Sequence, residues 1–254
     1  MSKRKRSAIR ALGPALMCAA MAWPAARAGE VRAAVAANFS ATAKEIGAAY
    51  AAASGDRVLF SFGPTGQLFA QIAQGAPFDV FLAADRARPQ RAVDQGFAVA
   101  HSLFIYATGR LVLYSRTPGV VTGADTLRQA VAGKLAIANP ATAPYGAAAV
   151  QVLRALGVYD RLRSKLVFGN GVAQAYQFVA TGNAELGLVA LSQVAGRDRG
   201  SRWLVPAGLH RAIVQAAVLL RPGADNPAAH AFLAFLKGPG AGAVKTKYGY
   251  DSED

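Results

Sequence analysis

The sequence predicts an α/β protein with two lobes and a ligand cleft between them. Short apolar strands alternate with helical segments along the chain, which favours parallel strand pairing in open sheets. A strand at Leu111–Ser115 leaves the first lobe, and a strand at Ile213–Leu220 returns to it. In open sheets of this kind, ligands bind at the carboxyl ends of the strands.

The first lobe is expected to hold residues 29–110 and 209–254. Its strands are predicted at Val31–Ala36, Arg57–Ser61 and Phe78–Ala84. Apolar residues at a 3.6-residue spacing predict a helix after the first strand, and a Gly-Pro-Thr-Gly turn opens another after the second.

The second lobe is expected to hold residues 111–208. After its entry strand, further strands are predicted at Lys134–Asn139, Lys165–Asn170 and Leu186–Leu191. Each is followed by a turn that opens a helix. The lobes are therefore joined by two crossings of the chain.

Residues 1–28 have the features of a secretory signal peptide. Five basic residues precede an apolar stretch, and Ala26-Arg27-Ala28 provides a small-x-small cleavage signal. The only cysteine, Cys18, lies inside this segment, so the mature chain is expected to have no disulfide. These features predict Sec-type export to the periplasm.

The chain is basic, with 28 Lys and Arg against 14 Asp and Glu. Its basic residues are scattered after residue 10, whereas runs of like charge are typical of nucleic-acid-binding arms. We expect no nucleic-acid partner, and a solvated surface that at most steers anions weakly.

Four segments contain no Asp, Glu, Lys or Arg, and each includes a strand-to-helix turn. Helix N-termini present free backbone N–H groups and partial positive charge, so four such turns could together hold a small oxyanion. Simple burial in an α/β sheet explains a lack of charge equally well. The segments are 33–43, 58–78, 135–153 and 166–183.

Four motifs resemble the molybdate-binding periplasmic proteins of ABC transporters, in order along nearly the whole mature chain. They are VAANF at 35–39, GPTGQLFAQIAQGAPFDVFLAAD at 63–85, NPATAPYG at 139–146 and FLKGPGAGAVKTKYGY at 235–250. The resemblance implies the type II periplasmic-binding-protein fold. It also implies that molybdate or tungstate is held between the lobes and delivered to a membrane permease.

The resemblance also implies the ligand-binding residues, which are Ala37 and Asn38 in the first turn, Thr65 in the second, Tyr145 in the third and Val172 in the fourth. Val172 would act through its backbone N–H. Some relatives have Thr or Ser in place of Ala37, which costs this chain one hydroxyl. Many relatives use a tyrosine within the strand 186–191, where this chain has none, and Tyr145 is its natural replacement.

Each assignment has a structural alternative. Asn38 and Thr65 could be helix caps, Tyr145 could be a surface aromatic residue, and Val172 could be a core residue without a ligand role. Asp79 and Asp85 are interpreted as structural, because a carboxylate would repel an oxyanion.

The sequence does not favour an enzyme. The three histidines lack metal-ligand spacing, and neither a nucleophile elbow nor a P-loop occurs. We expect no cofactor, because the metal enters as its oxyanion, and we expect the protein to act as a monomer. The alternative function is binding of another tetrahedral oxyanion, such as sulfate or phosphate.

Overall fold

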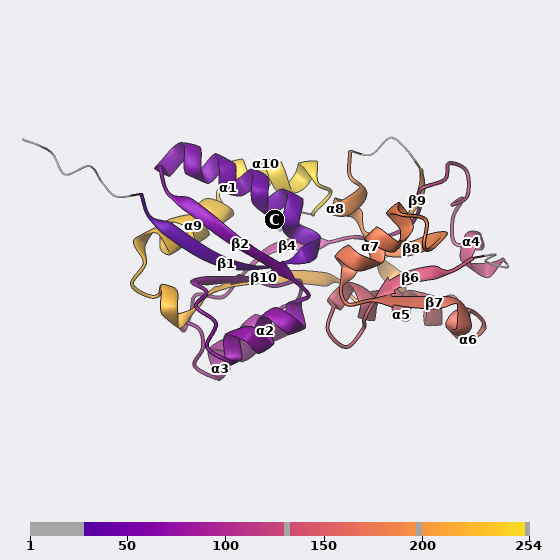
Figure 1. The fold of residues 1–254 in the computed structure, drawn as a ribbon, viewed down its shortest axis with the longest axis horizontal. Helices are drawn as coiled ribbons and strands as arrows, with labels where there is room; N and C mark the ends of the chain where they lie inside the picture. The colour runs from indigo at the N-terminus through magenta and orange to yellow at the C-terminus, as the bar shows by residue number, and fades with distance from the viewer. Residues whose placement is uncertain (1–27, 130–132, 197–199, 252–254) are drawn as a thin grey trace, which may run out of the picture.

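The structure is a computed structural model that describes residues 28–129, 133–196 and 200–251. Residues 1–27 of the expected signal peptide lie outside the described residues. The described chain forms two five-stranded sheets, each in its own α/β lobe (Figure 1). This confirms the predicted fold class. In the described ranges, no helix combines the length and apolar character needed to cross a bilayer.

Lobe I is built on the sheet with strand order β2-β1-β3-β10-β4. Its strands are β1 (Glu30–Ala36), β2 (Arg57–Gly63), β3 (Val80–Leu82), β4 (Phe104–Gly109) and β10 (Ile213–Leu219). Its helices are η1 (Ala37–Phe39), α1 (Ser40–Ser54), α2 (Thr65–Ala73), α3 (Ala87–Asp94), η4 (Arg221–Gly223), α9 (Pro227–Lys237) and α10 (Pro239–Lys247).

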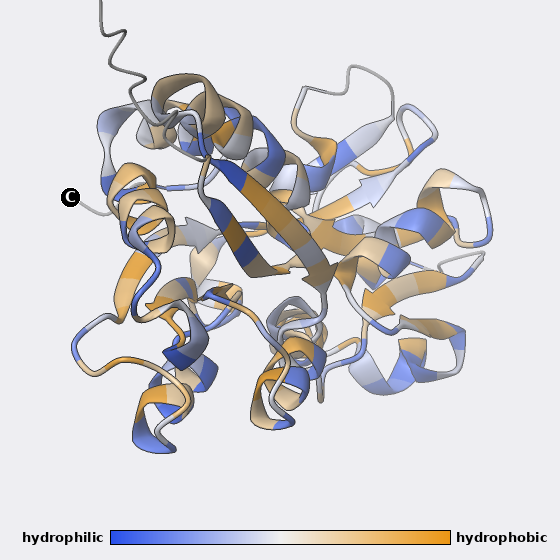
Figure 2. Ribbon diagram, turned by 60° about the vertical axis from the view of Figure 1, so that its left-hand side comes forward, coloured by the Kyte–Doolittle hydropathy of each residue, from blue (hydrophilic) through white to orange (hydrophobic). Residues whose placement is uncertain are grey.

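Helices cover both faces of the lobe I sheet. On one face, α1, α9 and α10 pack against it around Phe39, Tyr50 and Phe232 (Figure 1). On the other face, α2 and α3 pack around Leu68 and Phe81. Figure 2 shows the result, since the strands are largely hydrophobic and the helices carry hydrophilic segments. The sheet is thus a rigid support for the turns at its strand ends.

Lobe II is built on the sheet with strand order β7-β6-β8-β5-β9. Its strands are β5 (Leu111–Ser115), β6 (Leu135–Ala138), β7 (Leu166–Gly169), β8 (Leu186–Ala190) and β9 (Ser201–Leu204). Its helices are α4 (Asp125–Arg128), α5 (Pro144–Ala155), α6 (Tyr159–Leu162), η2 (Arg163–Lys165), α7 (Val172–Ala180), α8 (Leu191–Val194) and η3 (Ala207–Leu209).

The expectation of parallel pairing is only partly right. Strand β1 pairs in parallel with β2 and β3, and β6 pairs in parallel with β7 and β8. Strands β10 and β5 are antiparallel to their neighbours. Both strands lie next to a crossing between the lobes, so they enter their sheets from the cleft end and run in the opposite direction.

Candidate functional site

A small cavity lies between the lobes, and all five residues expected at the site line it. Its volume is about 10 Å³, which is the space required by about one water-sized sphere, so the lobes pack closely around it. No charged residue lines it; the lining consists of Ala36, Ala37, Asn38, Gly63, Pro64, Thr65, Ala84, Ala143, Pro144, Tyr145 and Val172.

Four helical segments begin at this cavity. They are η1, which runs directly into α1, and α2, α5 and α7. The two from lobe I follow β1 and β2, and the two from lobe II follow β6 and β7, so each begins at the carboxyl end of a parallel strand. The strand-to-helix turns of the four charge-free segments thus meet in one place.

None of these helix starts is capped by a side chain. The N-cap residues are Ala36, Pro64, Ala143 and Gly171, and none makes a side-chain capping bond. By contrast, Asn226 caps α9 by accepting a hydrogen bond from the Ala228 N–H. The first turns at the cavity also contain no acidic residue. Apart from the Gly66 N–H, which donates to the Thr142 carbonyl oxygen, their first amides and partial positive charges are therefore available to an anion.

Thr65 lies at the first position of α2 and is 1% exposed. Its Oγ1 accepts a hydrogen bond of 3.1 Å from the N–H of Ala84, which follows β3. The Thr65 side chain therefore binds the backbone just after β3 and does not cap α2. Because the oxygen is occupied as an acceptor, the hydroxyl hydrogen is free to be donated into the cavity.

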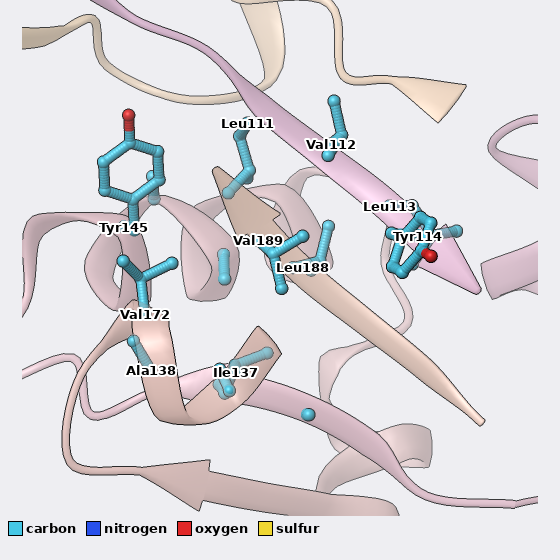
Figure 3. Close-up of a cluster of buried hydrophobic side chains, with 14 of the residues drawn as sticks. Leu111, Val112, Leu113, Tyr114, Ile137, Ala138, Tyr145, Val172, Leu188 and Val189 are labelled. Atoms are coloured by element: carbon cyan, nitrogen blue, oxygen red, sulfur yellow. The ribbon is translucent and has the colours of Figure 1, made fainter. Parts of the chain in front are cut away.

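Tyr145 is only 1% exposed, so the alternative of a surface aromatic residue is wrong. It lies beside Val172 at one end of the lobe II core, with its hydroxyl directed away from that core (Figure 3). Burial raises the pKa of Tyr145 well above its usual value, and the nearby hydroxyls of Tyr250 and Tyr106 add to the rise. The side chain is thus a neutral hydrogen-bond donor across the physiological range.

Asn38 is buried, but its side chain is engaged behind the cavity. Its Nδ2 donates to Gln215 Oε1 and to Tyr250 Oη, each at 3.0 Å. It does not cap a helix. The groups that Asn38 and its neighbour Ala37 can offer to a ligand are therefore backbone N–H groups, as at Val172.

Several direct contacts hold the lobes together around the cavity. The N–H of Gly66 donates to the Thr142 carbonyl oxygen at 3.0 Å, and Arg88 Nη2 donates to the Ala141 carbonyl oxygen at 3.2 Å. On the other side, Ser192 Oγ donates to the Asn38 carbonyl oxygen at 2.8 Å. These contacts describe a closed arrangement of the lobes.

Gly109, at the end of β4, is also required for this close approach. A Cβ atom at this position would overlap the hydroxyl of Tyr145 from the other lobe. A glycine at the crossing between β4 and β5 thus makes room for the expected ligand donor.

Asp79 and Asp85 have structural roles, as expected. Asp79 Oδ2 accepts from the Arg32 N–H at 2.6 Å. Asp85 Oδ1 accepts from the Arg88 N–H at 2.8 Å, and its carboxylate forms an ion pair with the Arg88 side chain. That ion pair also fixes the arginine that reaches Ala141.

A larger cavity of about 470 Å³ adjoins the small one and shares Ala84, Ala143 and Pro144 with it. Its lining includes Arg86 and Arg211, both exposed, and the ion pair between Arg88 and Asp85. This outer space therefore carries a net positive charge, whereas no charged residue lines the inner cavity. An anion that arrives from solvent would first meet the positively charged outer cavity and then the uncharged inner one.

Sequence reasoning missed the polar residues behind the cavity, namely Tyr106, Ser192, Gln215 and Tyr250. Gln215 gave the clearest signal, because it lies in the middle of the apolar strand Ile213–Leu219 and is fully buried. In the part of the chain that the structure describes, no group of three or more His, Cys, Asp or Glu side chains could hold a metal ion.

Comparison with known families identifies the class of protein to which the chain belongs. The chain belongs to the family described as bacterial extracellular solute-binding protein, which matches residues 31–251. Two relatives carry the description molybdate-binding protein ModA. The one from Rhodobacter capsulatus is 53% identical over 233 residues, which cover 92% of each chain. The one from Azotobacter vinelandii is 52% identical over 244 residues, which cover 94% of this chain and 95% of the relative.

A solved structure agrees with these sequence matches. The periplasmic molybdate-binding protein of Azotobacter vinelandii superposes with a TM-score of 0.85 at 39% identity, covering 88% of this chain and all of the other. The resemblance predicted from the sequence and the periplasmic-binding-protein fold are thereby confirmed.

Proposed function

We propose that this protein captures molybdate between its lobes and delivers it to the permease of an ABC transporter. The observation that carries the proposal is the convergence of four uncapped helix N-termini on one uncharged cavity between two lobes. The relatives that are about half identical over nearly the full length are molybdate-binding proteins.

Physical chemistry supports an oxyanion as the ligand. Molybdate is a tetrahedral dianion, and an anion in a cleft must be compensated for the water it loses. Helix N-termini supply roughly half a positive charge each, and hydrogen bonds to a charged group contribute about 1.5–3 kcal/mol each. The donors proposed here are the hydroxyls of Thr65 and Tyr145 and the backbone N–H groups of Ala37, Asn38 and Val172.

Several further properties belong to the same proposal. Tungstate, which has the same charge and shape, is expected to bind as a second ligand. Lobe I would comprise residues 29–110 and 209–254, and lobe II residues 111–208. The protein would be exported to the periplasm by its Sec-type signal peptide, act as a monomer, use no cofactor and catalyse no reaction.

Isothermal titration calorimetry of the mature protein tests the proposal. Molybdate, tungstate, sulfate and phosphate are titrated separately under the same conditions. We expect molybdate and tungstate to bind much more tightly than sulfate, because fixed donors that fit the larger anions cannot all reach the smaller one. Tight sulfate or phosphate binding without molybdate binding would contradict the proposal.

A further inference from the structure

Gln215, in the middle of β10, lies directly behind the cavity and is completely buried. Its side-chain oxygen receives two hydrogen bonds. Asn38 Nδ2 donates to Oε1 at 3.0 Å, and Tyr106 Oη donates to the same atom at 2.9 Å. The Tyr106 hydroxyl also lies 3.2 Å from the Ala83 carbonyl oxygen, so the donor that fixes the orientation of the amide is Asn38 Nδ2.

The opposite orientation is excluded by the neighbouring amide. Exchanging Oε1 and Nε2 of Gln215 would place its nitrogen against the Asn38 nitrogen, so that two donors would face each other. Asn38 cannot turn in response, because the same Nδ2 atom donates to Tyr250 Oη. The Tyr250 hydroxyl is itself held in place, because its one hydrogen is shared between the Asn38 carbonyl oxygen at 2.9 Å and Ser192 Oγ at 3.0 Å.

The fixed amide then determines what Tyr145 can do. Gln215 Nε2 donates to Tyr145 Oη at 3.4 Å, so the phenol oxygen is an acceptor on this side. The phenol retains one hydrogen, which must be donated elsewhere. Because Tyr145 lines the small cavity, a ligand bound there is placed to accept this hydrogen.

We propose that Gln215 is a positioning residue that fixes Tyr145 as a hydrogen-bond donor to the bound oxyanion. The inference rests on the proposed function, since Gln215 would act on the same ligand site through its contact with Tyr145. It also has a consequence for specificity. A donor that cannot turn into an acceptor favours fully deprotonated oxyanions over those that carry a proton. Gln215 belongs to lobe I and Tyr145 to lobe II, so the contact also links orientation of the donor to lobe closure.

A double-mutant cycle between Gln215 and Tyr145 tests this role. Molybdate affinity is measured by calorimetry for wild type, Gln215→Met, Tyr145→Phe and the double variant. We expect each single substitution to weaken binding about tenfold or more. The double variant should bind within about threefold of Tyr145→Phe alone, because the proposed effect of Gln215 on the ligand passes through Tyr145.

Tyr106→Phe is the matched control. It removes one donor to Gln215 Oε1, while the bond from Asn38 still fixes the amide. Its affinity should stay within about threefold of wild type, since the orientation is retained. If Gln215→Met does not fold, Gln215→Asn is used in its place. The shorter asparagine side chain keeps a polar amide in the buried position but does not reach the Tyr145 hydroxyl. Melting temperatures of the ligand-free variants show which of them are folded.

The positioning role alone would be overturned if the double variant lost as much affinity as the two single losses multiplied together. It would also be overturned by a folded Gln215 variant that binds molybdate like wild type. Wild-type protein that binds none of molybdate, tungstate, sulfate and phosphate would overturn both the role and the proposed function.

Discussion

The Thr65 hydroxyl provides a sharp test of the site, because a single atom is expected to serve both the fold and the ligand. Replacing Thr65 with valine keeps the shape of the side chain and removes the hydroxyl. The N–H of Ala84 then loses its acceptor, at a cost of about 1–3 kcal/mol in the free energy of unfolding. Loss of the donor to a dianion costs about 1.5–3 kcal/mol of binding free energy, or roughly a 10- to 150-fold increase in Kd.

The two costs are measured separately. Urea or thermal unfolding of the ligand-free protein gives the first, and calorimetric titration with molybdate gives the second. Thr65→Ser is the matched control, since it keeps the hydroxyl, and its molybdate affinity should stay within about threefold of wild type. Its loss of one buried methyl group costs about 0.5–1.5 kcal/mol in the free energy of unfolding, which the unfolding measurement of the control separates from the loss of the hydroxyl. Our interpretation of Thr65 would be refuted if Thr65→Val lost stability but kept its full affinity for molybdate.

Three further predictions concern the ligand, pH and lobe closure. Molybdate at 100 times its Kd should stabilise the protein by about 2.7 kcal/mol, a rise of roughly 5–10 °C in Tm by differential scanning fluorimetry; no rise would contradict binding to the folded state. Burial raises the pKa values of Tyr106, Tyr145 and Tyr250 above the usual value near 10. Their contribution to stability is therefore complete below about pH 10 and should decline at higher pH, by about 1.4 kcal/mol per pH unit for each tyrosine that ionises only on unfolding. Tyr145→Phe should reduce the slope of unfolding free energy against pH above pH 10, and an unchanged slope would contradict the assignment. Replacing Arg88 with glutamine removes its charge and weakens its contact with Ala141. Molybdate affinity should fall only about two- to fivefold, because the arginine is partly exposed, and a larger loss in calorimetry would mean that Arg88 contacts the ligand.

Local patterns were sufficient to predict much of the fold. Strand β1, its following helix and the turn at Thr65 were predicted within a few residues, because apolar periodicity and Gly-Pro turns act over short distances. The short elements α3, β4 and β9 were not identified. The direction of β10 was not predicted either, because it depends on the path of the chain between the lobes.

The candidate site, like the fold, was predicted only in part. The five residues taken from the family resemblance line one cavity, and their turns were visible as charge-free segments. The network behind them was not predicted, because its members are far apart in the chain. Asn38 and Gln215 are separated by 177 positions, and Asn38 and Tyr250 by 212. A single sequence has no local pattern that reports such pairings.

The central claim is that a tetrahedral dianion is held by uncharged groups at converging helix N-termini. A crystal structure of the mature protein with molybdate or tungstate, phased on the anomalous signal of the metal, tests it most directly. We predict one strong anomalous peak in the cavity lined by Asn38, Thr65, Tyr145 and Val172, with the oxygens of the anion within about 3.2 Å of the proposed donors. A peak in the arginine-lined outer cavity, or an anion held by charged side chains, would contradict the claim.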